Sequence, residues 1–142
     1  MTDHSLTRLE GWPALMAAEH AHWREQRFVW GTYDCLGLCR RSAIAICGAD
    51  PLGDLPAYGS ERDALKKLRR LGFASAVDLV SAHLEEIPPA MARRGDWVLI
   101  PTQSVLGCAF GVNTGRHAAH MGLDGLVMIN AAESARAWRV GQ

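Results

Sequence analysis

A cysteine directly after an aspartate, Cys35 after Asp34, is the side chain in this sequence best placed to act as a nucleophile. The pair comes where a turn gives way to an apolar helical pattern, so we expect Cys35 in the first turn of a helix. The positive end of the helix dipole and unpaired backbone N–H groups stabilise a thiolate at such a position. A cysteine peptidase also needs an imidazole within hydrogen-bond reach, which activates the thiol and later protonates the leaving amine.

The candidate bases are His117 and His120, which fall on one predicted strand in the second half of the chain. Successive side chains of a strand point to opposite faces, and a slip of one residue in register reverses every face. The sequence therefore leaves open whether either imidazole approaches Cys35. The alternative is that both histidines are strand residues with one exposed edge and that Cys35 packs as a small apolar side chain.

A metal site is a second kind of chemistry that the cysteines suggest. Cys35, Cys39, Cys47 and Cys108 could supply thiolates for zinc or for an iron–sulfur cluster. Cys35 and Cys39 share one face of the predicted helix, but Cys47 lies about 18 Å from Cys35 at about 1.5 Å of rise per residue. At most three of these cysteines can meet, so we expect no metal and no other cofactor.

The elements that must position these residues are predicted to be helical in the first half of the chain. Pro13 suits the first turn of a helix, Gly48 suits a helix C-terminus, and Ser60 resembles the first residue of a capping box. Residues 88–89, both proline, end the helical half. Four helices are expected, over residues 12–26, 34–47, 60–72 and 75–84.

The second half of the chain changes to the pattern of short strands. Asp96 precedes a short apolar strand, and Asp124 with Gly125 suits a tight turn between two later strands. Helices followed by an antiparallel meander indicate an α+β fold, in which N-terminal helices pack on a C-terminal sheet of four to five strands within a single domain, residues 1–142. The expected strands cover residues 97–100, 105–112, 116–121, 126–129 and 137–140.

Charge and composition argue against several classes of partner. Fifteen basic and fifteen acidic side chains give a formal net charge of zero, and the basic residues are spread along the chain, so we expect no nucleic-acid partner. The longest apolar stretch, residues 36–47, is interrupted by Arg40 and Arg41 and is too short to span a bilayer. The N-terminus shows no signal-peptide pattern, so we expect synthesis in a cytoplasm, where cysteines stay reduced.

Three segments, in order along the chain, resemble the NlpC-type cysteine peptidases. Residues 30–38 (WGTYDCLGL) are similar to the nucleophile segment of that family, and residues 94–99 (RGDWVL) are similar to its Gly-Asp turn into the first strand. Residues 109–115 (AFGVNTG) are similar to the strand that carries its catalytic histidine. The resemblance implies a papain-like layout in which Cys35 lies at a helix start and faces the sheet near Ala109.

One position departs from that family. Ala109 stands where the family has its catalytic histidine, and the family's third polar residue would fall near His117 to His120. The resemblance therefore implies a degenerate peptidase scaffold without enzymatic activity. The alternative is an active cysteine peptidase or peptidoglycan hydrolase that uses Cys35 with His117 or His120.

The chain also resembles an uncharacterised family encoded among phage tail genes. The shared features include the Trp12-Pro13 start and the closing residues 137–140 (AWRV). This resemblance implies a structural or assembly component of a bacteriophage or prophage tail, at the tail tip, present in the virion after synthesis in the bacterial host cytoplasm. Its partners would be other tail proteins in a symmetric ring, with Trp138 and Arg139 as interface anchors. A cellular binding module unrelated to phage is the remaining alternative.

Overall fold

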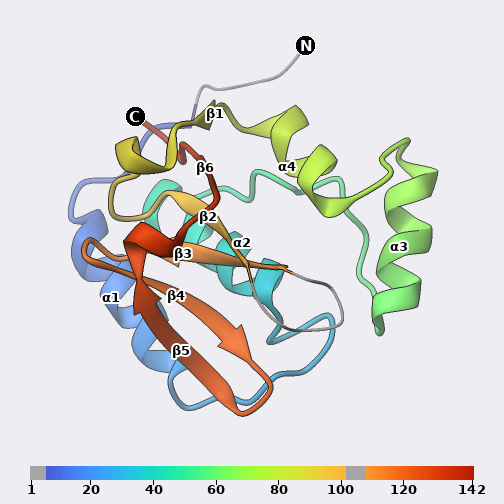
Figure 1. Cartoon of the computed structure of the whole chain (residues 1–142), viewed down its shortest axis with the longest axis horizontal. Coiled ribbons are helices and arrows are strands. Elements are labelled where there is room, and N and C mark those ends of the chain that lie inside the picture. The colour runs from blue at the N-terminus through green and yellow to red at the C-terminus, as the bar shows by residue number, and fades with distance from the viewer. Residues whose placement is uncertain (1–5, 102–107) are drawn as a thin grey trace.

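The computed structural model describes residues 6–101 and 108–142 and has an α+β architecture (Figure 1). Helices occupy the first half of the chain and an antiparallel sheet the second, as the sequence predicts. The helices are α1 (Trp12–Trp23), α2 (Cys35–Cys47), α3 (Glu61–Arg70) and α4 (Ala76–His83). The strands are β1 (Glu86–Ile87), β2 (Trp97–Pro101), β3 (Cys108–Asn113), β4 (His117–Gly122), β5 (Gly125–Asn130) and β6 (Arg136–Trp138). Two short 3-10 turns, η1 (Pro89–Met91) and η2 (Ala131–Glu133), separate strands.

The sheet has six strands in the order β1-β6-β2-β3-β4-β5 among the residues described, and each pairing is antiparallel. The predicted number, four to five, was too low because β1 was missed. Only two residues, Glu86 and Ile87, form β1, and they pair with Trp138 and Ala137 of β6. Two residues are too few for an alternating pattern to show in the sequence.

Side-chain caps begin three of the helices. The carboxylate of Asp34 accepts the N–H of Gly37 at the start of α2, with N···O 2.7 Å. Ser60 caps α3 and Ser75 caps α4, each hydroxyl accepting an N–H three residues ahead. Helix α1 ends at Trp23, three residues earlier than predicted. The N–H groups of Glu25 and Gln26 bond three rather than four residues back, because the chain tightens as the helix ends.

The main hydrophobic core lies between the sheet and the helices, with α1 and α2 behind the sheet in Figure 1. From α2, the buried side chains Leu38, Cys39, Ala43 and Ile46 enter this core. The helix-facing side chains of the sheet are Trp97 and Leu99 from β2, Phe110 and Val112 from β3, Ala119 and Met121 from β4, and Trp138 from β6. Helix α1 is held to α2 by a buried hydrogen bond of 2.6 Å between His20 and Ser42, and burial lowers the pKa of His20.

The opposite face of the sheet carries a second, smaller core. Its buried members are Ile87, Val98, Ile100, Ala118 and Ala137. These residues alternate along their strands with the helix-facing residues, as the two-residue period of a strand requires. In the described part of the chain, no helix combines the length and the apolar character needed to cross a bilayer.

A buried ion pair joins the N-terminal segment to the entrance of β2. The guanidinium of Arg8 lies 3.0 Å from the carboxylate of Asp96, and both side chains are almost fully buried. The same carboxylate accepts the backbone N–H groups of Arg93, at 2.9 Å, and Val140, at 3.0 Å. Asp96 therefore connects three segments that are far apart in the sequence.

Arg8 completes this network with hydrogen bonds to backbone carbonyls. It donates to the carbonyl of Val140 at 2.9 Å and to that of Arg94 at 2.6 Å. Between Arg94 and Asp96, Gly95 has a φ of 94°, and a Cβ there would lie 2.9 Å from the side chain of Ile46. The Arg-Gly-Asp turn predicted before β2 therefore has a structural role, and its Gly95 and Asp96 are buried.

Removal of the Asp96 carboxylate tests how much this network of Arg8 and Asp96 stabilises the fold. We expect Asp96→Ala to lower the free energy of unfolding by about 3–5 kcal/mol, because it leaves the Arg8 charge buried without its counter-ion. Urea unfolding followed by circular dichroism measures the loss. The control is Glu86→Gln, which breaks the exposed pair between Glu86 and Arg136 and should cost less than about 1 kcal/mol. Equal losses in the two variants would contradict a special role for Asp96.

Candidate functional site

The helix start that carries Cys35 is fixed by the buried side chain of Asp34. Cys35 is the first residue of α2, as predicted, and Asp34 is the N-cap. The Asp34 carboxylate is 2% exposed and accepts three hydrogen bonds, from the N–H of Gly37 at 2.7 Å, the N–H of Gly31 at 2.9 Å and the hydroxyl of Tyr58 at 2.8 Å. These three donors satisfy the carboxylate, so its role at the site is to hold the helix start in place.

Tyr58 and Gly31 close the other side of this cap. Burial, together with the adjacent carboxylate of Asp34, raises the pKa of Tyr58, so its hydroxyl stays protonated and donates to Asp34. Gly31 has a φ of 82°, and a Cβ there would overlap the backbone carbonyl of Tyr58. The glycine before the Asp-Cys pair is therefore required by this close approach.

The Cys35 thiol points from the helix to the sheet. Its Sγ donates to the backbone carbonyl of Met121 in β4 across 3.4 Å, and the side chain is partly buried against the main core. The prediction that Cys35 lies at a helix start and faces the sheet is confirmed. The side chain of Cys35 is only partly buried.

Ala109 lies on β3, but its side chain belongs to the other face of the sheet. Ala109 pairs with Ile100, a member of the smaller core, whereas its neighbour Phe110 faces the helices. A Cβ on Gly111, two residues along, would likewise contact the side chain of Ile100. The expectation that Cys35 faces Ala109 is therefore wrong, because the register of β3 turns Ala109 away from α2.

The structure does not bring His117 or His120 to the Cys35 thiol. His117 lies four residues along β4 from Met121, which is roughly 13 Å at about 3.3 Å per residue. His120 alternates with Ala119 and Met121 and so faces away from the helices. Burial lowers the pKa of His120, which favours a neutral imidazole on that face. Neither position is within the hydrogen-bond reach of about 3 Å that a general base needs.

Another histidine lies beside the segment that leads to Cys35, and the sequence did not single it out. An imidazole nitrogen of His22 in α1 is 3.1 Å from the hydroxyl of Tyr33, two residues before Cys35. The rings of His22 and Tyr33 are also in contact, with centroids 5.8 Å apart. The packing of α1 beside the start of α2 creates this proximity, and no local sequence pattern encodes it.

The cysteines of α2 are distributed along the helix. Cys39 is fully buried and its Sγ contacts the carbonyl of Gly111 at 3.4 Å. Cys47 lies at the other end, where a Cβ on Gly141 would approach its Sγ. Burial raises the pKa of both thiols. Within residues 6–101 and 108–142, no group of three His, Cys, Asp or Glu residues is arranged to hold a metal ion, and the side chain of Cys108 lies outside this description.

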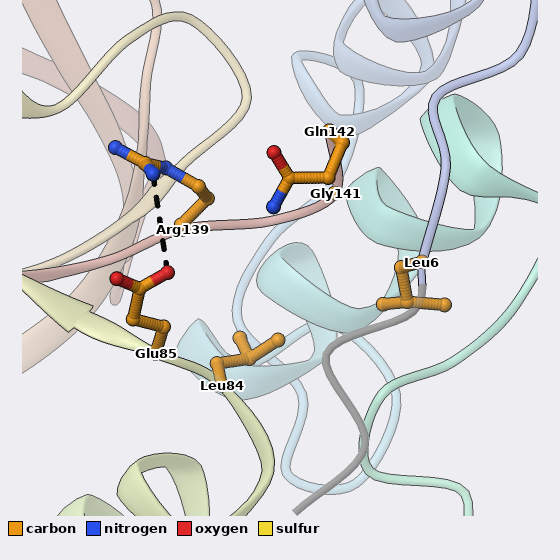
Figure 2. A pocket seen from close by; sticks show the side chains of 6 residues that line it. All are labelled: Leu6, Leu84, Glu85, Arg139, Gly141 and Gln142. Atoms are coloured by element: carbon orange, nitrogen blue, oxygen red, sulfur yellow. Dashed lines mark ion pairs between the residues drawn. The ribbon is translucent and has the colours of Figure 1, made fainter.

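Two hollows mark the surface of the described residues. The first has room for about one water molecule, with a volume of about 10 Å³. Figure 2 shows Arg139 and Glu85 at one side of it, with Leu6 and Gln142 opposite. The second is an open depression of about 360 Å³, lined by Ile100, Pro101, His120, Ile129 and Glu133. It lies on the face of the sheet away from Cys35.

The two residues predicted as interface anchors differ in exposure. Trp138 is fully buried, packs against Phe110 and donates its indole N–H to Ser81 at 3.1 Å. Trp138 therefore has no exposed surface with which to act as the predicted interface anchor, because β6 lies inside the sheet between β1 and β2. Arg139 is partly exposed and is 3.9 Å from Glu85 (Figure 2). Arg139 alone of the two is accessible to a partner.

The burial of Trp138 predicts a large effect on stability. We expect Trp138→Ala to lower the free energy of unfolding by about 3–5 kcal/mol, because it removes a large buried ring and leaves a cavity. Thermal and urea unfolding measure this loss. Leu123→Ala is the control, since Leu123 is 82% exposed and its truncation should change stability by less than about 0.5 kcal/mol. A Trp138→Ala protein as stable as the control would contradict the buried position.

Comparison with known proteins gives one family. A search of the curated proteins finds no match to the chain. The sequence model described as "Domain of unknown function (DUF6950)" matches residues 7–140. This range contains α1 to β6, both partners of the Arg8–Asp96 ion pair, and Cys35 with its cap. The chain therefore belongs to the DUF6950 family.

Proposed function

We propose that this chain is a non-catalytic structural or assembly component of a bacteriophage or prophage tail, at the tail tip. It would be built on a degenerate NlpC-like peptidase scaffold, made in the bacterial host cytoplasm and incorporated into the virion. The positions of His117 and His120 support the non-catalytic part of the proposal, and the resemblance to a family encoded among phage tail genes supports the tail part. His117 lies far along β4 from the thiol contact at Met121, and His120 faces away from the helices.

The arrangement of the elements supports the peptidase ancestry in this proposal. A cysteine at the start of a helix packs on an antiparallel sheet, and the Gly-Asp turn leads directly into β2. These are two of the relations that the resemblance to NlpC-type peptidases implies, whereas a third, Ala109 facing Cys35, is not met because Ala109 lies on the other face of the sheet. The polar residues of the matched segments, Asp34 and Asp96, accept backbone and side-chain hydrogen bonds within the fold. Such a scaffold persists without catalysis because its polar groups stabilise the structure.

A cysteine hydrolase is the second candidate, and one observation favours it. Cys35 is the first residue of a 13-residue helix, where the helix dipole stabilises a thiolate. For catalysis, an imidazole other than those of His117 and His120 would have to move to the Cys35 thiol. His22, which lies beside Tyr33, is one candidate. Activity measurements separate this candidate from the first.

Hydrolysis assays test whether the thiol is catalytic. We expect purified wild-type protein and Cys35→Ala to release equal, background amounts of peptide from purified peptidoglycan sacculi, since neither His117 nor His120 lies within reach of the Cys35 thiol. Chromatography of the released fragments is the measurement, and an active NlpC-type peptidase serves as the positive control. Release that depends on Cys35 would reject the non-catalytic proposal in favour of the hydrolase. A further loss in His22→Ala would then identify the base.

Particle analysis tests the structural role. We expect mass spectrometry of purified tails to detect this chain, in several copies per particle if it forms a ring. Each copy would bury about 800 Å² against a neighbour, the size of a standard interface. Arg139→Glu should reduce incorporation about tenfold, equivalent to about 1.4 kcal/mol of binding. Arg69→Glu, an exposed change on α3, is the matched control. Intact tails that lack the protein would contradict the proposal.

A further inference from the structure

The two edges of the sheet differ in how they are protected. The β1 edge is two residues long and carries Glu86, which forms an ion pair of 2.7 Å with Arg136. The β5 edge at the other end is six residues long, Gly125–Asn130, and contains neither a charged residue nor a proline. Short length, charge and proline are the usual devices that prevent edge strands from pairing with other chains. The β5 edge has none of the three.

The backbone groups that β5 presents at this edge follow from its pairing with β4. The N–H of Ala131 donates to the carbonyl of Arg116 at 2.9 Å, so 116 and 131 form a hydrogen-bonded pair. Hydrogen-bonded pairs alternate along an antiparallel ladder, and 125, 127 and 129 therefore bond to β4. Leu126, Met128 and Asn130 direct their N–H and C=O groups to the open edge. Among the described residues, no backbone hydrogen bond outside the β4–β5 ladder involves them.

Apolar side chains surround these outward-directed groups. Val127 is 40% exposed and Met128 is 46% exposed, although both sit in the middle of a strand. They lie on opposite faces, because Val127 is opposite His120 and Met128 is opposite Ala119 in β4. Leu123, in the hairpin that joins β4 to β5, is 82% exposed. The edge is thus apolar on both faces and offers backbone donors and acceptors between them.

We propose that β5 pairs in antiparallel register with β5 of a second copy of this chain. A two-fold axis perpendicular to the sheet keeps each side chain on its own face. The residue at the centre of the pairing must therefore lie opposite the same residue of the other copy. Centred on Val127, it places each Val127 opposite the other, and Leu126 of one copy opposite Met128 of the other. The outward-directed groups of Leu126 and Met128 then form the hydrogen bonds of the new ladder.

A second copy is the occupant because the strand is complementary to itself in this register. Every pair from 125 to 129 is apolar or glycine, and Asp124 of one copy lies opposite Asn130 of the other, so no like charges meet. Val127 meets its counterpart at a non-hydrogen-bonded position, where side chains across an antiparallel pair are closest. Pairing of two short strands buries less surface than a standard interface of about 800 Å² per partner. We therefore expect a dimer that dissociates on dilution.

Charge exchange at the two-fold axis tests the pairing. Analytical ultracentrifugation of the wild-type protein should show a concentration-dependent shift from the 15.5 kDa monomer to twice that mass. Val127→Lys and Val127→Glu should each be monomeric, because each brings two like charges together at the axis. An equimolar mixture of the two should form the dimer again, since the charges are then opposite. A misfolded variant would not recover in the mixture, and circular dichroism confirms that each variant is folded.

Two further measurements complete the test. Leu15→Lys is the control, because Leu15 is 43% exposed on α1 and its charge should leave the dimer unchanged. Val127→Cys should form an intermolecular disulfide on mild oxidation, at a rate well above the wild-type background from native cysteines, since paired Cβ atoms lie about 4.5–5.5 Å apart. A wild-type protein that stays monomeric up to about 1 mM has a dimer Kd well above that concentration and would overturn the proposal. Failure of the mixture to dimerise would overturn it as well.

The pairing is independent of the proposed tail function. It concerns the β5 edge, whereas the hydrolase and particle experiments concern Cys35 and Arg139. If the protein is dimeric but absent from tails, the β5 pairing stands and the tail function is rejected. If it is present in tails but monomeric, the tail function stands and the β5 pairing is rejected. The ultracentrifugation and the particle analysis therefore distinguish failure of one proposal from failure of the other.

Discussion

The buried ion pair between Arg8 and Asp96 is the constraint on which the arrangement of the chain depends. It holds the N-terminal segment against the entrance of β2, and the same carboxylate binds the backbone of Val140 after β6. The end of the chain reaches this carboxylate because β6, the last strand in sequence, lies between β1 and β2 in the sheet. Removing one partner would leave a charge in the core, so the three segments are stable only together.

The start of α2 is likewise held by hydrogen bonds to a buried carboxylate. Three donors from separate turns converge on the Asp34 carboxylate, and this fixes both the first turn of the helix and the direction of the Cys35 thiol. A buried carboxylate needs such donors, because burying it without them costs several kcal/mol. Asp34 and Asp96, the two aspartates of the segments that resemble NlpC-type peptidases, thus serve the fold. The two histidines predicted as bases are kept from Cys35, His117 by its distance along β4 and His120 by its position on the other face of the sheet.

The proposed tail role and the proposed pairing of β5 depend on how the thiol, the histidines and the edges of the sheet are placed. The thiol is accessible only in part, and the histidines predicted as bases lie elsewhere. The one long edge of the sheet carries no charge, whereas the opposite edge is short and held by ion pairs. A family model that extends from residue 7 to residue 140 includes both edges and the ion pair that closes the chain.

The sequence by itself determined the local structure, and the tertiary structure decided what each residue faces. The caps at Asp34, Ser60 and Ser75 were predictable because each bond spans three residues, and so were the α+β order and the helix start at Cys35. The face of Ala109 was not, since it depends on the register of β3 against β2. Nor was the burial of Trp138, because β6 is enclosed only when the end of the chain inserts between β1 and β2. Caps and periodicity act between near neighbours, whereas register and burial depend on contacts between segments that are distant in sequence.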